Sequence, residues 1–521
     1  MHTQKKSVWI TLLRSGNRLV IDPTTPRVKS LLEAKLSYVE KKFFHGPELA
    51  KRKRMHLPPC ENITWECFSE DHRGRLATSY GFLSRIRQVL KKAGFKVRTR
   101  WALPEEAALA EQRSQTVYKP HWERIDRVVE DGYQFRYMQK EALQIIAEKE
   151  SGRISCPPGW GKGDTITQAC MLFAKAKIAV VTRNVAVLHQ RLFPALSMAL
   201  PSVGIVGGGK KIKGRRVMCY TAGSLHHAQG DEDFVFVDEG DQACSDVYAE
   251  RMAMFDHARI WMFSATWDMR LDNKNMRAEA MAGPIRLRVS YREAEDNKMV
   301  LPVEVFLTDV ITDVNPCTDF DGYEKKRAGI WAHEYRNSLI AADANRYDDD
   351  VQILITVDTV EHGLYLQRLL PNFAFVYAGK NLKSYQLKAF HEKGLIDDDW
   401  QIMTDERKAK LTRRFEKGYL KKAIATTVWN VGVNFKGLQV IIRADGSGSP
   451  ANDTQVPGRA VRLHDDKQVA IVHDYLDQFD TGYHAKAEHR IKSYEANEWT
   501  VHRPDKSKKS RLRQLMLWGE R

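Results

Sequence analysis

The sequence predicts an α/β protein with two parallel sheets covered by helices, preceded by a small α+β module. The first observation is an alternation of short β-rich runs with helical patterns over residues 131–285. The second is the same alternation, which begins again near Val351. Such alternation is typical of parallel sheets, in which ligands bind at the carboxyl ends of the strands. The third is the order of two segments, 156–164 and 237–241, whose residue types suit phosphate and a divalent cation.

The length of 521 residues allows about three domains of ordinary size, each with its own core. We expect five parts: an accessory nucleic-acid-binding domain at 1–125, an ATP-binding parallel-sheet domain at 126–290, a linker or inter-domain insertion at 291–350, a second parallel-sheet domain at 351–485 and a basic extension at 486–521. The accessory part mixes β-like stretches at 8–13 and 63–68 with an amphipathic helix from about Tyr80 to Ala93. Gly94 is expected to end that helix.

The two alternating blocks supply the strands of the two sheets. In the first block, strands are expected at 154–156, 178–182, 217–220, 234–237 and 260–264. In the second, they are expected at 353–357, 373–377, 423–426, 440–443 and 469–474.

Two segments of the first block carry the chemistry. Residues 156–164, Cys-Pro-Pro-Gly-Trp-Gly-Lys-Gly-Asp, contain a Gly-x-Gly-Lys core. Glycines let backbone N–H groups close around phosphate oxygens, and the lysine supplies a positive charge. Downstream, the apolar run 234–237 ends in Asp238 and Glu239. A buried strand would deliver one carboxylate to hold Mg²⁺ through water and the other to align or deprotonate an attacking water. Together they favour a nucleoside triphosphatase site.

The charge balance favours a polyanionic partner. Lys and Arg number 82 against 66 Asp and Glu, which gives a net charge of +16. Nucleic acid is favoured over an anionic membrane surface, because no long basic amphipathic helix with an aromatic-rich apolar face is present. Basic residues concentrate at 51–54, 85–100 and 506–513, and each cluster suits either a contact surface or a solvated face.

Compartment and redox state follow from what the chain lacks. No apolar run is long enough to span a bilayer and no signal peptide is recognisable, so we expect a cytoplasmic protein without membrane contact. The seven cysteines include no Cys-x-x-Cys pair, and Cys60 and Cys67, the closest two, have no His-x-x-x-His partner. Reduced structural thiols are therefore expected rather than zinc ligands or disulfides.

The middle and C-terminal parts resemble the superfamily-two helicases, motif by motif and in order. Residues 135–139 are similar to the adenine-reading segment of that family, and motifs I, Ia, Ib, II and III are matched by residues 156–163, 180–190, 221–225, 238–241 and 264–266. Motif IV, the helix before motif V, motif V and motif VI are matched by residues 353–355, 406–418, 425–434 and 455–462. The resemblance implies two RecA-like domains that form a helicase core, with ATP and Mg²⁺ as cofactors and hydrolysis stimulated by DNA.

The resemblance also assigns roles to individual residues. It implies catalysis by Lys162, Asp238, Glu239, Gln455, Arg459 and Arg462, and metal binding by Asp238 and Glu239. It implies nucleotide binding by Arg136, Gln139, Pro158, Gly159, Trp160, Gly161, Lys162, Gly163, Asp164, Thr165 and Gly432. Contacts to nucleic acid are implied for Thr182, Arg183, Ser224, Thr426 and Thr427, and coupling of the nucleotide state for Ser264, Ala265 and Thr266.

The arginines of motif VI explain why two blocks are needed. Guanidinium groups stabilise the negative charge that redistributes on the γ-phosphate during phosphoryl transfer. Arg459 and Arg462 belong to the second block and Lys162 to the first, so the resemblance places the nucleotide between them. Hydrolysis would then change the force that closes the two blocks and step a nucleic-acid strand along.

Two positions depart from the family pattern. Gly163 stands where the family has Ser or Thr as a ligand of Mg²⁺, which leaves Asp238 to hold the metal through water, with Thr165 as a replacement. Asn434 stands where many relatives have aspartate, which puts a polar contact there in doubt.

Within the superfamily, the likeness is nearest to the phage branch-migration helicases of the UvsW type. It rests on the compact length, the basic accessory module, the Arg-x-x-Gln segment and the Asp-Glu-x-Asp form of motif II. Those helicases act on forked and branched DNA in recombination, replication and repair, which implies the host cytoplasm if a phage encodes the chain. Two alternatives stay open: an RNA helicase, for which Asp-Glu-Ala-Asp would be expected, and an ATP-switched clamp with weak hydrolysis, favoured only by Gly163. A monomer fits, but the sequence leaves the oligomeric state open.

Overall fold

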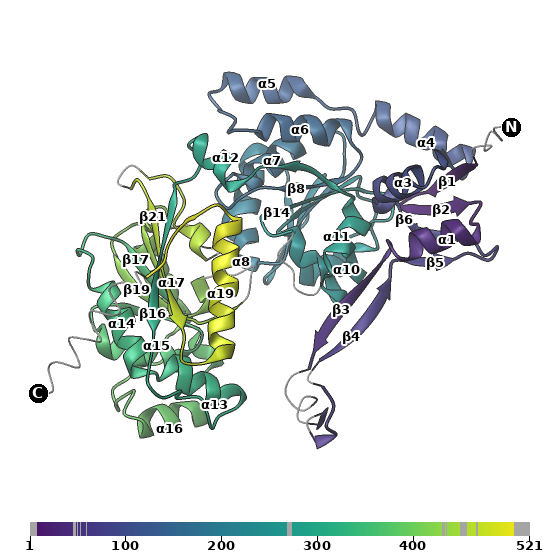
Figure 1. Cartoon of the computed structure of the whole chain (residues 1–521). Helices are drawn as coiled ribbons and strands as arrows, with labels where there is room; N and C mark the ends of the chain where they lie inside the picture. Colours follow the sequence, from purple (N-terminus) through teal and green to yellow (C-terminus); the bar gives the residue numbers. More distant parts are fainter. Residues whose placement is uncertain are drawn as a thin grey trace, which may run out of the picture. The chain divides into compact units, whose positions relative to one another are not determined.

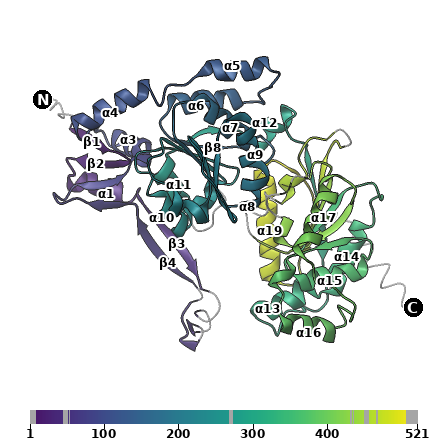
Figure 2. The same cartoon turned by 180° about the vertical axis from the view of Figure 1, so that it is seen from behind.

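The computed structural model describes residues 8–44, 48, 51–52, 54–58, 60–267, 273–429, 433, 435–448, 456–464 and 467–504. The chain divides into two compact units, Met1–Val289 and Ser290–Arg521. Figures 1 and 2 give the elements of each unit from two sides. Three residues that the sequence singles out, Gly432, Asn434 and Gln455, lie outside the described residues, as does the basic segment 506–513.

The first unit begins with a five-stranded sheet. Its strand order is β5 (Phe68–Glu70), β6 (Leu76–Ser79), β2 (Arg18–Asp22), β1 (Trp9–Ser15) and β7 (Lys96–Trp101). The helices α1 (Pro26–Glu33) and α3 (Leu83–Lys92) contribute Val28, Leu32, Ile86 and Leu90 to the core beneath it. α3 confirms the amphipathic helix that the sequence predicts, and α4 (Pro104–Gln115) follows the sheet.

A hairpin extends away from this sheet in both views of the first unit (Figures 1 and 2). β3 (Ser37–Phe43) pairs antiparallel with β4 (Cys60–Glu66) over its full length. The base of the hairpin is bonded to the segment that carries α11 (Asn275–Ala282). Asn273 Nδ2 donates to the carbonyl of Val39 at 2.9 Å, Arg277 Nε donates to the hydroxyl of Tyr38 at 2.7 Å, and Lys274 lies 3.0 Å from Glu40.

The first parallel sheet has eight strands. Their order is β11 (Lys210–Ile212), β10 (Gly204–Gly207), β12 (Val217–Thr221), β9 (Ile178–Thr182), β13 (Phe234–Asp238), β14 (Arg259–Ser264), β8 (Gly152–Ser155) and β15 (Ile285–Arg288). Only the β10–β11 pair is antiparallel among the described pairs. The covering helices are α5 (Trp122–Glu130), α6 (Gln139–Glu148), α7 (Lys162–Leu172), α9 (Phe193–Ala199), α10 (Asp246–Met252) and α11. All five strands expected from the sequence are present.

The register of this sheet gathers three segments at one edge. Ser155, which ends β8, pairs with Ser264, which ends β14, and Asp238 at the end of β13 pairs with Phe263. Because the strands are parallel, the loop after β8, the residues after Asp238 and those after Ser264 leave the sheet at the same carboxyl edge. Ligands bind at this edge in open α/β sheets.

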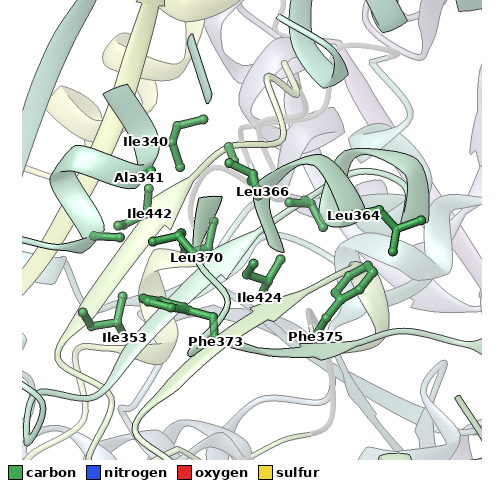
Figure 3. Packing of buried hydrophobic residues seen from close by; sticks show 14 of the residues in the cluster. Ile340, Ala341, Ile353, Leu364, Leu366, Leu370, Phe373, Phe375, Ile424 and Ile442 are labelled. Atoms are coloured by element: carbon green, nitrogen blue, oxygen red, sulfur yellow. The ribbon is translucent and has the colours of Figure 1, made fainter. Parts of the chain in front are cut away.

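The second unit is built on a seven-stranded sheet whose described pairs are all parallel. Its strand order is β18 (Ala374–Val376), β19 (Lys422–Ala425), β17 (Ile353–Thr356), β20 (Val440–Arg443), β21 (Ala470–Asp477), β16 (Val303–Val310) and β22 (Thr500–His502). Its helices are α12 (Tyr291–Asp296), α13 (Gly322–Lys326), α14 (Glu334–Ala344), α15 (Val360–Leu369), α16 (Ser384–Glu392), α17 (Asp405–Glu416) and α19 (Thr481–Ala496). Figure 3 shows the core between helices and sheet, where Leu366 and Leu370 approach Ile353, Ile424 and Ile442. Two parallel-sheet units thus bear out the predicted fold class.

The second sheet extends on both sides of the region 351–485. β16 lies in the segment 291–350, expected as a linker, and pairs with β21 and β22. β22 and the end of α19 lie beyond residue 485. β16 joins strands more than 150 residues further along the chain, and a periodicity within one segment cannot reveal such a partner.

All seven cysteines lie within the described residues, and none of them is part of a disulfide. Within the described part of the chain, no helix is both long enough and apolar enough to cross a membrane.

Candidate functional site

The loop between β8 and α7 owes its shape to glycines. Gly159 and Gly161 have φ angles of 88° and 103°, in the left-handed region that residues with a Cβ rarely adopt. A Cβ at Gly161 would stand 2.5 Å from Nε2 of Gln139, so a larger residue would have to displace that side chain. α7 begins at Lys162, and the N–H groups at a helix N-terminus attract anions. The loop therefore suits a phosphate group.

Lys162 and two carboxylates form an ionic cluster at the carboxyl edge of the first parallel sheet. Nζ of Lys162 donates to Oε1 of Glu239 at 2.7 Å. Burial alone would lower the pKa of Lys162, but the charges of Glu239 and Asp238 outweigh it and raise this pKa above its usual value. Burial raises the pKa of Asp238 to about 6; Lys162 opposes that shift and Glu239 adds to it. The cluster thus keeps a cation beside two acids.

Asp238 has an oxygen that fits a metal ion. The residue ends β13 and is 7% exposed. Its Oδ1 is buried and accepts no hydrogen bond from a described residue. A buried acceptor without a partner costs free energy. Mg²⁺ binds carboxylate oxygens and keeps several waters, so Asp238, with Glu239 beside it, fits the metal that the resemblance implies.

Glu239 adopts a left-handed backbone conformation, with a φ of 54°. That conformation costs a residue with a side chain roughly 1–2 kcal/mol. Gly240 follows it closely against β14, since a Cβ there would stand 2.7 Å from Cβ of Met262. The turn brings the carboxylate of Glu239 to Lys162. Backbone strain of this kind is concentrated at functional sites.

Asp241 joins the ends of β13 and β14. Its two oxygens accept from the hydroxyl of Ser264 at 2.6 Å and from the hydroxyl of Thr266 at 3.0 Å. All three side chains are buried. Burial raises the pKa of Asp241, Glu239 adds to the rise and the two hydroxyls oppose it. These two bonds connect the turn after β13 to the segment 264–266, and Ala265 lies half-buried between Ser264 and Thr266.

Gln139 and Arg136, expected to read adenine, are bonded to the phosphate loop. Nε2 of Gln139 donates to the carbonyl of Trp160 at 3.1 Å, and its Oε1 accepts from the N–H of Arg136 at 3.0 Å. Nη1 of Arg136 donates to the carbonyl of Gly159 at 2.7 Å. An adenine contact by either side chain would have to replace these bonds.

The remaining residues of the loop between β8 and α7, and of the first turn of α7, differ in how far their side chains are buried. The side chain of Trp160 is fully buried and its Nε1 donates to the carbonyl of Tyr137 at 2.9 Å, so it supports the loop from within and does not cover a nucleotide. Thr165 is also buried and donates to the carbonyl of Gly161 at 3.3 Å, within its own helix. Its hydroxyl is thus not turned outward to replace the one missing at Gly163. Asp164 is exposed and Pro158 is half-buried.

The hydroxyls expected to contact nucleic acid are mostly turned inward. Thr182 is 1% exposed, and Thr426 is buried. The hydroxyl of Ser224 bonds to the backbone N–H and the hydroxyl of Thr221 in a capping box. The hydroxyl of Ser224 therefore caps the turn that follows β12. Of the five residues, Arg183 and Thr427 are exposed.

The arginines of motif VI belong to the second unit. Nη1 of Arg459 donates to a backbone carbonyl at 3.0 Å, and Arg462 is half-buried. Lys467 was not singled out by the sequence, yet its Nζ donates to the carbonyls of Leu438 and Ala460, each at 2.9 Å. Through these two hydrogen bonds, Lys467 stabilises the position of the segment that contains Arg459 and Arg462. No local pattern announces this role, because one of its two partners, Leu438, lies 29 residues earlier in the chain.

Comparison with known proteins gives a family match and several distant structural likenesses. Residues 346–464 match the family described as helicase conserved C-terminal domain. No curated protein matches the chain at a significant level. The chain is similar to UvsW of phage T4 (14% identity, 95% of this chain and 98% of that chain, TM-score 0.39). It is also similar to Dbp5 of S. cerevisiae bound to RNA and ADP BeF3 (14% identity, 72% and 91%, TM-score 0.48).

A third similar structure is the fragment of a putative HsdR subunit of a type I restriction enzyme from Vibrio vulnificus YJ016 (14% identity, 86% and 88%, TM-score 0.48). Likenesses this distant assign neither an activity nor a substrate. The family match lies within the second unit, whose residues 346–464 are similar to the helicase conserved C-terminal domain.

Proposed function

We propose that the chain is an ATP-dependent DNA helicase or translocase that acts on branched or forked DNA in recombination, replication and repair. One observation carries the proposal: Lys162, Asp238 and Glu239 meet beside a glycine-shaped phosphate loop, at the carboxyl edge of a parallel sheet. This combination suits phosphoryl transfer better than it suits any structural role.

Each member of the cluster has a part in ATP hydrolysis. Lys162 would neutralise phosphate oxygens, and Glu239 would orient the attacking water and accept its proton. Asp238 would hold Mg²⁺, which supplies positive charge against the phosphates when bound. Asp241, bonded to Ser264 and Thr266, would pass the state of this turn to the segment before α11.

The hairpin β3–β4 supports a nucleic-acid partner. Lys41 and Lys42 are exposed on β3, and Lys51 and Arg54 are exposed beyond it. The guanidinium of Arg52 lies 4.0 Å from the ring centroid of Phe44. Exposed cations on a projecting arm suit the phosphates of a duplex, and the counterions they release would make that binding salt-sensitive.

The hairpin also favours a branched substrate. Its base contacts Lys274, which precedes α11, and Arg277 within α11, the helix that follows the segment 264–266. A duplex arm held by the hairpin would therefore act on the same helix that receives the nucleotide state. Such a connection is useful to an enzyme that moves a strand relative to a held duplex.

An ATPase assay with four activators tests the proposal. Forked DNA, linear duplex, single-stranded DNA and RNA are compared at equal nucleotide concentration. We expect forked DNA to stimulate turnover most, and strand displacement from forks to require ATP. Strongest stimulation by RNA would assign the chain to the RNA helicases instead.

The clamp is the second candidate, because Gly163 removes a hydroxyl at the metal and Thr165 does not present its own outward. A clamp would bind forked DNA more tightly with ATP than without it and hydrolyse ATP at the same low rate with or without DNA. Multiple turnovers per bound DNA would exclude it.

A further inference from the structure

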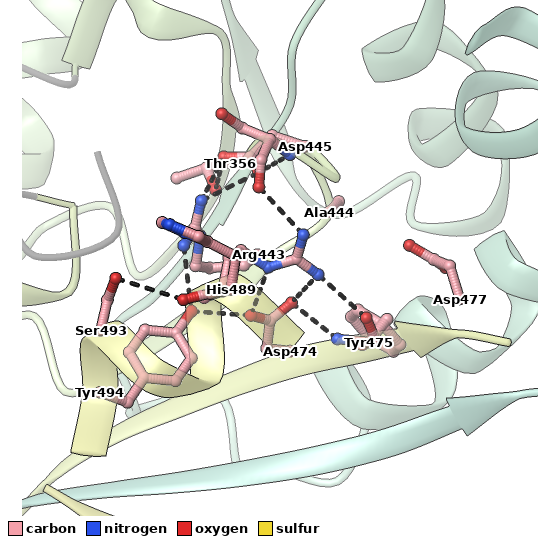
Figure 4. Close-up of polar contacts among 12 residues, drawn as sticks. Thr356, Arg443, Ala444, Asp445, Asp474, Tyr475, Asp477, His489, Ser493 and Tyr494 are labelled. Atoms are coloured by element: carbon pink, nitrogen blue, oxygen red, sulfur yellow. Dashed lines mark hydrogen bonds and ion pairs between the residues drawn. The ribbon is translucent and has the colours of Figure 1, made fainter. Parts of the chain in front are cut away.

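The loop after β20 is held by an unusual number of buried charges. Six side chains, three arginines and three aspartates, lie beneath or beside it and are each at most 9% exposed: Arg336, Arg443, Arg490, Asp445, Asp474 and Asp477. Figure 4 shows the contacts around Arg443, Asp445, Asp474 and Tyr494. Burying ion pairs stabilises a fold little, because desolvation offsets their attraction. What such a network does achieve is to fix the groups that it touches in one arrangement.

The backbone of residues 444–448 is the part that this network fixes. Arg336 Nη1 donates to the carbonyl of Ala444 at 2.8 Å, and Arg490 Nη1 donates to the carbonyl of Ser447 at 2.9 Å. Oδ1 of Asp445 accepts from the N–H of Ser447 at 2.9 Å. Two helices, α14 and α19, therefore hold a short glycine-containing loop at the carboxyl edge of the second sheet.

Arg490 is itself held in place. Its Nε and Nη2 bond to the two oxygens of Asp474 at 2.8 Å and 2.9 Å. The hydroxyl of Tyr494 donates to Asp474 at 2.7 Å and accepts from Arg443 Nη1 at 3.0 Å. A rigid loop with a second layer of support is what a binding site requires, whereas a simple connection between strands does not need it.

Lysines gather around this loop. The stem of Lys486, on α19, packs against Gly448: a Cβ at Gly448 would stand 3.1 Å from its Cγ. Lys325 lies 2.7 Å from Asp480, and Lys326 lies 2.7 Å from Asp358. Lys486 is exposed and forms no ion pair with a described residue. Lys325 and Lys326 thus each have a carboxylate partner, and Lys486 adds a further positive charge.

The pKa of Lys486 reflects the positive charges around it. Partial burial lowers the pKa of Lys486. The charges of Lys326, Arg490 and Lys325 lower it further, and only Asp480 raises it. Because Lys486 is surrounded by other cations, the binding of an anion beside it would be favourable.

We propose that Lys486 and the loop 446–448 form a binding site for a backbone phosphate of the nucleic-acid strand. The loop follows β20, Asp358 follows β17 and Asp480 follows β21, so the cations surround the carboxyl edge where the second unit would bind its ligand. Gly448 lets the stem of Lys486 lie directly against the backbone of the loop. The inference rests on the proposed function in one respect, that the partner is a nucleic acid.

The experiment compares four forms of the full chain: wild type, Lys486→Gln, Lys486→Arg and the control Lys492→Gln. Lys492 is exposed on the same helix, six residues on and therefore about 120° around it. Binding of labelled single-stranded and forked DNA is measured by fluorescence anisotropy over a series of salt concentrations. Affinity for ATP and the ATPase rate without DNA are measured alongside.

We expect Lys486→Gln to weaken DNA binding about fivefold at moderate salt. The slope of log affinity against log salt should become shallower by about 0.7, the change for one phosphate contact on a single strand. Lys486→Arg should restore both, and Lys492→Gln should resemble wild type. ATP affinity and the basal ATPase rate should not change.

Three results would overturn the site. Lys486→Gln could bind DNA with wild-type affinity and slope, Lys492→Gln could match its loss, or Lys486→Gln could lose ATP affinity, which would place the charge beside the nucleotide. A wild-type chain that binds no DNA at any salt concentration would remove the proposed function together with the site. The two failures are therefore distinguishable.

Discussion

Gly163 gives the sharpest test of the nucleotide site, because the space for a side chain is already present. A Cβ at Gly163 would have Leu192 Cδ2 as its nearest neighbour, at 3.5 Å, which is ordinary van der Waals contact. Gly163 is the second residue of α7, and its φ lies outside the left-handed region. Gly163→Ser should therefore be accommodated without strain. It should also stabilise the helix by about 0.5 kcal/mol, since glycine is the poorer helix former.

The hydroxyl should improve metal binding as well. One additional oxygen partner contributes about 1 kcal/mol, which corresponds to a roughly fivefold lower Mg²⁺ concentration at half-maximal ATPase. The assay is a Mg²⁺ titration of the ATPase rate at fixed ATP. Gly163→Ala is the matched control, because it also removes the glycine and favours the helix at least as much, without adding a hydroxyl. If Ser and Ala lower the Mg²⁺ requirement equally, the reasoning about a missing ligand is refuted.

Three further predictions concern the two units. Lys162→Ala and Glu239→Gln should each reduce ATP turnover by about 10²-fold or more while DNA binding by anisotropy stays near wild type; undiminished turnover would remove the assigned site. Arg462→Ala should lower kcat more than nucleotide affinity, because its charge would act mainly in the transition state, and equal losses would indicate a structural arginine. Burial lowers the pKa of Lys467 to about 8 from 10.5, and the charge of Arg462 adds to the shift. Its contribution to stability is therefore complete above 10.5 and lost as the pH falls through 8, so Lys467→Met should flatten the rise of the urea midpoint between about pH 8 and 10.5.

The sequence predicts an element correctly where the hydrophobic pattern lies within one continuous segment. β13 reads as a continuous apolar run and is buried along its whole length, as expected of a strand covered on both faces. β16 alternates in burial and is just as regular, but its neighbours β21 and β22 come from the end of the chain. The sequence therefore predicts that β16 is a strand, but it does not predict which strands pair with it.

The accessory part illustrates the same limit at a boundary. A cut near residue 125 looks natural in the sequence, yet α3 and α11 lie in one compact unit. Arg85 on α3 bonds to both oxygens of Glu279 on α11, the shorter contact being 2.6 Å. A Cβ at Gly81 would stand 2.0 Å from the carbonyl oxygen of Glu279. Removing residues 1–125 would therefore disturb α11 itself, and single substitutions on the hairpin are the cleaner test of DNA binding.

Whether a hydroxyl side chain points into the protein or toward solvent is the feature that was hardest to predict from the sequence. Thr182, Ser224 and Thr266 are all small polar residues at or just after strand ends, and the family pattern gives the first two to nucleic acid and the third to coupling. In the structure all three are buried. Thr266 meets Asp241 because β13 and β14 are neighbours in a fixed register, whereas Ser224 closes its own turn by bonding to Thr221. A hydroxyl with a buried partner transmits movement or caps a helix. Arg183, Thr427 and Lys486 are exposed, so their side chains remain the ones to test for a phosphate contact.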